Sequence, residues 1–172
     1  MIPLVQAMIE IALHRRGPQD LPASLFLLGL VLAAYATVGF TSALIYQPGA
    51  GIAAMQVALD LLLFGAFFWI VLTMYRKPAR WLQTFTALLG TGAILSLIAM
   101  PLHLWRQATG AEQSAALLPA LGLFALLLWS LAVIGHILHH ALEIPYLGGI
   151  VVAMGYFALN IVLFALMFPV PA

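Results

Sequence analysis

Five long apolar stretches, separated by short polar connectors, dominate the pattern of hydrophobic and polar positions along the chain. A membrane-spanning helix needs roughly 20 mostly apolar residues, and backbone groups in lipid must find their hydrogen-bond partners within their own segment. Stretches of this length therefore predict helices. The expected spans are residues 22–46, 51–75, 81–105, 115–139 and 145–168. The predicted fold class is all-α, an integral membrane bundle of five transmembrane helices in one membrane domain, residues 1–172.

The connectors contain residues that end helices. Gln47-Pro48-Gly49 and Arg76-Lys77-Pro78 separate the first three spans, and a polar loop covers residues 106–114. Glu143-Ile144-Pro145 divides an apolar stretch that is far too long for a single crossing. The last stretch is therefore expected to form two helices.

The first seventeen residues differ from the spans because they are apolar but short. Polar side chains recur there at every fourth position: Gln6, Glu10 and His14. This pattern predicts an interfacial amphipathic helix over residues 1–17, ended by Gly17-Pro18. The basic pair follows the apolar part, which is not the order of a cleaved signal. Asp20 or Ser24 can cap the helix that comes next.

Composition agrees with a protein solvated by lipid. Hydrophobic residues make up 65% of the chain and charged residues 6%, whereas about a quarter of the residues in a soluble domain are charged. The net charge of +1 does not favour nucleic-acid binding, which needs a basic face. The sequence has no cysteine, so disulfides and thiolate metal sites are excluded.

Basic residues near the span ends predict the orientation. Positive charges stay on the cytoplasmic side, and all but Arg106 fall on one side of the expected topology: Arg15, Arg16, Arg76, Lys77 and Arg80. We therefore expect an inner-membrane protein with a cytoplasmic N-terminus and with the tail Val170-Pro171-Ala172 outside. Aromatic residues fall where interfacial belts are expected: Tyr46, Tyr75, Trp81, Trp105 and Tyr146.

Asp60 is the main polar anomaly, because it lies near the middle of the second span. Gln56 lies one turn earlier, and Asn160 or Thr37 could support the carboxyl from neighbouring helices. A proton or cation pathway would need Asp60 beside a wet cavity. Alternatively, a protonated or hydrogen-bonded Asp60 joins helices, and the absence of a second acid within the spans favours this structural role.

Three histidines form the other polar group. His136 and His140 share a helix face, His139 adjoins them, and Glu143 could add an oxygen ligand for Zn, Cu or Ni. His103 lies near the opposite membrane face, so it cannot clamp a haem together with His136. The alternative is that the cluster meets helix-end carbonyls and lipid phosphates. We expect no bound metal and no cofactor.

Small residues at helical spacing predict close helix contacts. The first span contains such a row: Gly29, Ala33, Thr37 and Thr41. The row favours a packing face within the bundle over a seam between two copies. Weaker rows are Gly149 with Ala153 and Gly92 with Ser96.

The motifs of hydrolases, phosphate-binding loops and zinc proteases are missing from the sequence, so no catalytic residues are predicted. The interfacial helix, the break Arg-Arg-Gly-Pro-Gln-Asp-Leu-Pro at residues 15–22 and the five tightly connected spans resemble the bacterial branch of the Yip1-like membrane proteins. That resemblance implies a small non-enzymatic membrane protein. Asp20-Leu21-Pro22 replaces the longer motif of eukaryotic members, so no functional residue carries over.

The sequence thus favours an accessory, scaffold or assembly protein. Its expected partners are the lipid bilayer and other membrane proteins or a second copy of the chain. A small transporter or proton-coupled permease using Asp60 is the first alternative. A metal-handling protein using His136, His139 and His140 is the second.

Overall fold

Helices dominate the structure, a computed structural model that describes residues 2–46, 49–109 and 113–168. Five of the helices in these ranges are long and apolar enough to cross a membrane, which fits a multi-pass membrane protein. They are α2 (Leu25–Tyr46), α3 (Ala50–Met74), α4 (Trp81–Ala108), α5 (Gln113–Leu142) and α6 (Tyr146–Met167). The all-helical class and the five apolar helices are confirmed. The predicted break at Gln47-Pro48 and the tail Val170-Pro171-Ala172 lie outside the described residues.

The ends of the five long helices differ from the predicted span ends by three residues or fewer. The loop predicted over residues 106–114 is shorter than expected, because α4 continues to Ala108 and α5 already begins at Gln113. Ser24 rather than Asp20 caps α2, since its hydroxyl accepts a hydrogen bond from the Leu27 amide at 3.3 Å. Asp20 instead accepts a hydrogen bond from the Gly17 amide and closes the short 3-10 turn η1 (Pro18–Asp20).

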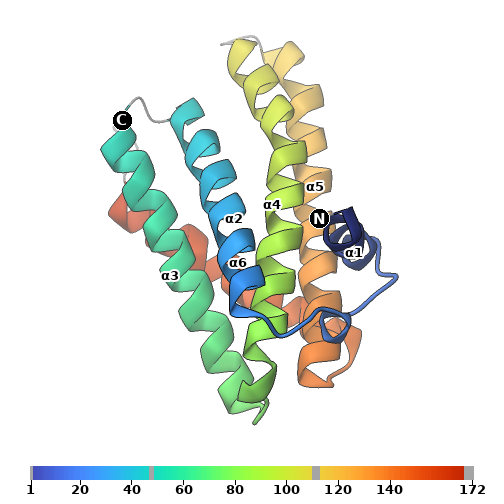
Figure 1. Ribbon diagram of the computed structural model, residues 1–172. Coiled ribbons are helices and arrows are strands. Elements are labelled where there is room, and N and C mark those ends of the chain that lie inside the picture. Colours follow the sequence, from blue (N-terminus) through green and yellow to red (C-terminus); the bar gives the residue numbers. More distant parts are fainter. Residues whose placement is uncertain (1, 47–48, 110–112, 169–172) are drawn as a thin grey trace.

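Helix α4 is the centre of the bundle. It packs against α2 on one side and α5 on the other, while α6 runs obliquely behind the other spans (Figure 1). Every residue from Thr84 to Thr91 is buried. Burial on this scale needs neighbours on all sides of the helix, and it fixes the position of the elements around α4.

The crossing of α5 and α6 brings two backbones together. A Cβ atom placed on Gly149 would overlap the carbonyl oxygen of Gly135, and one on Gly135 would lie 2.6 Å from Cγ1 of Ile150. Only glycine at both positions allows this approach, which is the usual way that helices pack in lipid. The crossing sets the path along which α6 reaches α3.

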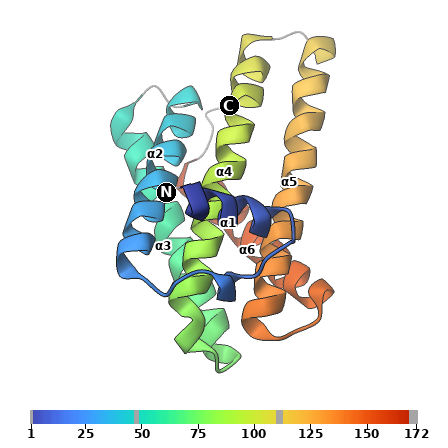
Figure 2. The same cartoon turned by 45° about the vertical axis from the view of Figure 1, so that its right-hand side comes forward.

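The first helix, α1 (Ile2–Ala12), lies across α4 and α5 (Figure 2). Met8 packs over Gly90, and the indole N–H of Trp129 donates a hydrogen bond to the Ala12 carbonyl at 3.0 Å. The predicted end of this helix at Gly17 is wrong. His14 adopts a left-handed backbone with φ 59°, and the Arg15 amide bonds back to the Glu10 carbonyl at 2.8 Å, which closes the helix after Ala12.

Candidate functional site: a carboxylate held by three helices

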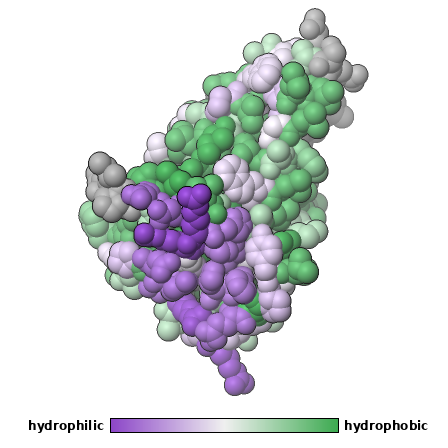
Figure 3. Space-filling view, turned by 90° about the vertical axis from the view of Figure 1, so that its right-hand side faces the viewer, coloured by the Kyte–Doolittle hydropathy of each residue, from purple (hydrophilic) through white to green (hydrophobic). Residues whose placement is uncertain are grey.

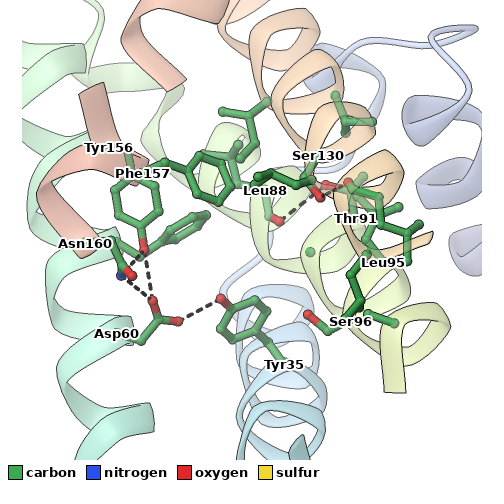
Figure 4. Close-up of a pocket in the computed structure, with 18 of the residues that line it drawn as sticks. Tyr35, Asp60, Leu88, Thr91, Leu95, Ser96, Ser130, Tyr156, Phe157 and Asn160 are labelled. Atoms are coloured by element: carbon green, nitrogen blue, oxygen red, sulfur yellow. Dashed lines mark hydrogen bonds between the residues drawn. The ribbon is translucent and has the colours of Figure 1, made fainter. Parts of the chain in front are cut away.

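Asp60 lies in the interior of α3 and accepts hydrogen bonds from two neighbouring helices (Figure 4). The Tyr35 hydroxyl of α2 donates to Oδ2 at 2.7 Å, and the Tyr156 hydroxyl of α6 donates to Oδ1 at 2.9 Å. The Asn160 amide donates to the same Oδ1 at 3.1 Å and to the Tyr156 hydroxyl at 3.2 Å. Asp60 takes part in none of the ion pairs found among the described residues. Its carboxyl group is therefore satisfied by neutral donors alone.

Local packing holds these donors in place. Tyr156 and Asn160 are one turn apart on α6, so both side chains point toward α3. The Tyr156 ring is buried and packs edge-on against Phe64 with a centroid separation of 5.1 Å. Tyr35 fits against Gly92 of α4, where a Cβ atom would lie 3.0 Å from its ring. The two hydroxyls are thus fixed by aromatic packing and by a glycine.

Two cavities meet at Asp60. The larger, about 290 Å³, extends toward α5 and has apolar walls that include Leu88, Leu95 and Leu126. The smaller, about 200 Å³, lies on the side of Gln56 and Val57. Both cavities share the same polar boundary: Tyr35, Asp60, Ser96 and Asn160. Asp60 is therefore half-buried between two spaces that could admit a small molecule.

The structure brings together some of the residues that the sequence singled out for Asp60, and it separates others. Asn160 donates to the carboxyl group, and Gln56 lines the smaller cavity. Thr37 does not take part, because it is exposed and its hydroxyl bonds to the Ala33 carbonyl of its own helix at 2.8 Å. Tyr35 and Tyr156 were missed. Tyrosines in the interior of a span, away from the interfacial belts, were the signal that could have identified them.

The small-residue row of α2 does not form the bundle contact that was predicted. A Cβ atom on Gly29 would meet no atom within 4 Å. All four members of the row are exposed: Gly29, Ala33, Thr37 and Thr41. Leu27 and Val31 are the buried residues of α2 instead. The prediction of a packing face within this chain is wrong for these residues, because large side chains fill the contact with the rest of the bundle. A seam between two copies stays a prediction.

The histidine cluster lies where α5 ends and includes a fourth imidazole, His14. The rings of His14 and His136 are 4.6 Å apart, and those of His136 and His140 are 4.7 Å apart. Three of the four rings bond to backbone carbonyls: His14 to Ala132, His136 to Arg16, and His139 to Ile144. Within the described ranges, no group of three or more His, Asp or Glu side chains is placed to hold a metal ion.

His103 lies at the other end of the bundle. Its Nδ1 atom is 2.6 Å from the Tyr46 hydroxyl, near the ends of α4 and α2. His136 is close to the end of α5, which runs antiparallel to α4 (Figure 1). The two imidazoles therefore lie at opposite ends of the bundle, as the sequence indicated.

Ionic contacts join the helix ends on the side of the histidines. The Glu143 carboxylate accepts hydrogen bonds from Lys77, at 2.5 Å, and from Arg80. The guanidinium of Arg80 also donates to the carbonyls of His140 and Ala141 at 3.0 and 3.1 Å. Hydrogen bonds from Lys77 and Arg80 lower the pKa of Glu143 below its ordinary value of 4.5. On the side of the molecule that lies to the right in Figure 1, hydrophilic residues gather in the lower half (Figure 3).

No family model, curated protein or solved structure matches this chain. The proposal for a function therefore rests on the geometry of the residues around Asp60.

Proposed function

We propose that this protein is a small multi-pass membrane carrier that exchanges an organic cation for a proton at Asp60. The observation that supports the proposal is that the carboxyl group borders two cavities and is satisfied by three neutral donors. Placing Asp at the centre of a spanning helix costs about 2.5–3.5 kcal/mol. Hydrogen bonds to a charged group contribute about 1.5–3 kcal/mol each. Three donors can therefore hold an ionised carboxylate without a protein cation, which leaves the carboxylate available to a ligand.

The lining of the larger cavity suggests the class of ligand. An ammonium group next to Asp60 would also face the rings of Tyr35, Phe64 and Tyr156, and aromatic faces attract cations. The leucine walls would take up an apolar chain. A volume of about 290 Å³ lies at the lower end of the range for small-molecule sites. The best candidate is a small amphipathic ammonium ion.

Proton and cation would compete for the same group. Asp60 is the only acidic residue in the five spans, since the other four acids of the sequence are in the first seventeen residues or in connectors: Glu10, Asp20, Glu112 and Glu143. The two tyrosine hydroxyls can each donate to a carboxylate or accept from a carboxylic acid. The site can therefore hold either form of Asp60, and loss of the cation would be coupled to gain of a proton.

The orientation and the place of α1 are part of the proposal. We place the ends that carry Lys77, Arg80 and Glu143 in the cytoplasm of a cell with an inner membrane, which puts the N-terminus inside and the C-terminus outside. Helix α1 buries Met8 and Ile11 against the bundle but exposes Val5 and Ile9, and Leu13 directly after the helix is exposed as well. These exposed residues would face acyl chains of the inner leaflet, with Gln6 and Glu10 turned toward the polar surface.

Binding and exchange can be tested separately. Purified protein in nanodiscs is titrated with hexyltrimethylammonium, which cannot lose a proton, and with hexanol as the uncharged comparison. We expect thermal stabilisation by the ammonium ion alone. Asp60→Asn should keep the fold, because the amide has a similar shape and hydrogen-bonding capacity, and it should weaken binding by at least about tenfold. Thr37→Val is the matched control away from both cavities.

Exchange is measured in proteoliposomes that contain a pH-sensitive dye. Addition of the ammonium ion should drive proton movement with the wild type and with Thr37→Val, and not with Asp60→Asn. Equal stabilisation by hexanol and the ammonium ion would exclude the cation site. Binding without proton movement would exclude the carrier and leave a binding protein.

An accessory or scaffold role is the second candidate, in line with the Yip1-like layout. It is favoured by the exposed row of small residues on α2, which is open to a neighbouring helix. Gly29→Leu should then reduce crosslinking to a neighbouring membrane protein or a second copy. If Gly29→Leu changes no crosslink in native membranes, this candidate loses its support.

A further inference from the structure

A third cavity, of about 190 Å³, lies apart from Asp60, where η1 meets the start of α4 and the end of α5. Most of its lining residues have polar side chains: Gln19, Arg80, Gln83, Thr84, His140 and Glu143. Gln83 donates its amide to the Leu21 carbonyl at 2.8 Å, which holds the chain after η1 against α4. The amide oxygen of Gln83 is then left as an acceptor. The cavity is thus bounded by the ends of two spans and by the segment that leads out of α1.

Thr84 is the unusual residue of this cavity. Its side chain is 1% exposed, and its hydroxyl has no hydrogen-bond partner in the part of the chain that the structure describes. The other buried threonines of α4 behave differently, because Thr86 bonds to the Leu82 carbonyl and Thr91 to the Ala87 carbonyl. A buried hydroxyl that does not bond to its own helix loses its hydration without compensation. This lone hydroxyl in a polar cavity points to a ligand.

The charges around the cavity are balanced. Arg80 and Glu143 line the cavity with one charge of each sign. Outside the lining, Lys77 adds a positive charge through its ion pair with Glu143, and Asp20 adds a negative charge at the end of η1. Two charges of each sign favour a ligand that also has both signs over a simple anion. Arg80 offers N–H donors suited to phosphate, and the Glu143 carboxylate can accept from an amine.

We propose that this cavity binds the phosphoethanolamine group of a membrane lipid. The phosphate would contact Arg80, His140 and the Thr84 hydroxyl, and the ammonium group would contact Glu143 and the Gln83 carbonyl. The position of the cavity at the ends of α4 and α5 allows the acyl chains to stay in the bilayer while the headgroup enters. Free phosphoethanolamine has the same chemistry, and the experiment separates the two sources.

The test uses full-length protein in detergent, stripped of lipid and titrated with short-chain phosphatidylethanolamine, phosphatidylglycerol, soluble phosphoethanolamine and inorganic phosphate. Native mass spectrometry counts bound lipid, and calorimetry gives the affinity of the soluble probes. We expect phosphatidylethanolamine to bind at least fivefold more tightly than phosphatidylglycerol. If the soluble compound binds as tightly as the lipid, the lipid source is wrong.

Thr84→Val and Thr86→Val form a matched pair on the same helix. Thr84→Val should weaken binding of phosphatidylethanolamine about fivefold and leave the unfolding temperature of the lipid-free protein unchanged or higher, because the hydroxyl has no partner to lose. Thr86→Val should leave lipid binding unchanged. Equal affinity of wild type and Thr84→Val, or tighter binding of phosphatidylglycerol, would overturn the proposal.

Discussion

At the scale of single residues, Glu143 joins the ends of three helices, since it follows α5 and binds Lys77 after α3 and Arg80 before α4. Its pKa is lowered from 4.5 in the folded protein by hydrogen bonds from Lys77 and Arg80. A carboxyl group with a lowered pKa stabilises the fold above its unfolded pKa, and this contribution is lost as the pH falls through the folded pKa.

We therefore expect Glu143→Gln to lower the unfolding temperature at neutral pH. The difference from the wild type should shrink as the pH falls from about 5 to about 3, because the wild-type carboxylate is then protonated. Thermal unfolding in one detergent over this pH range is the measurement. A difference that stays constant over the range would mean that the ion pairs do not stabilise the fold.

The site around Asp60 could be predicted only in part from individual residues. A carboxylic acid inside a span is costly enough to stand out from sequence alone, and Asn160 was one of few polar side chains available to it. Thr37 was an equally reasonable partner, but its hydroxyl bonds to its own helix. Tyr35 and Tyr156 differ from the interfacial tyrosines because they lie in the interior of their spans, but their rings are mainly apolar and the sequence does not indicate which group their hydroxyls bond.

At the scale of helices, the contact of α5 with α6 depends on Gly135 and Gly149. A methyl group on Gly149 would overlap the backbone of Gly135, which cannot move without separating the helices. We expect Gly149→Ala to cost about 1–3 kcal/mol of unfolding free energy. Gly148→Ala is the matched control, because its Cβ atom would lie 3.5 Å from Ile144, an ordinary contact.

Reversible unfolding in mixed detergent micelles measures both variants. Gly149→Ala should also weaken ligand binding at Asp60, since α6 carries Tyr156 and Asn160 to that carboxyl group. Equal stability of the two variants would show that the helices separate at little cost.

The rows of small residues show why helix faces were harder to predict than helix positions. Gly149 and Ala153 of α6 are buried, and Gly92 receives the Tyr35 ring, although these rows were the weaker ones in the sequence. The stronger row of α2 is exposed. Lipid is as apolar as leucine, so burial provides no hydrophobic driving force that would reveal the inner face of a span. Spacing alone therefore indicates where helices can approach and does not identify the helices that do.

At the scale of the whole molecule, the number of spans was predictable because the bilayer fixes the length of a crossing and the requirement for internal hydrogen bonds leaves only helices. The oblique path of α6 and the position of α1 across α4 and α5 were not predicted. Both depend on particular close contacts, Gly149 on Gly135 and Met8 on Gly90, between segments that are distant in the sequence.

Orientation is the remaining property of the whole molecule, and it stays a prediction from the positions of the basic residues. Lys77 and Arg80 are held at one end of the bundle by Glu143, while Arg106 is near the opposite end of α4. Because basic residues are retained in the cytoplasm, cysteines at Pro78 and Thr109 should differ in their reaction with an impermeant maleimide. The native chain has no cysteine, so each substitution supplies the only thiol. Thr109→Cys should react in intact cells and Pro78→Cys only after permeabilisation. Labelling of Pro78→Cys but not Thr109→Cys in intact cells would invert the topology, and it would place the proposed headgroup cavity on the outer face.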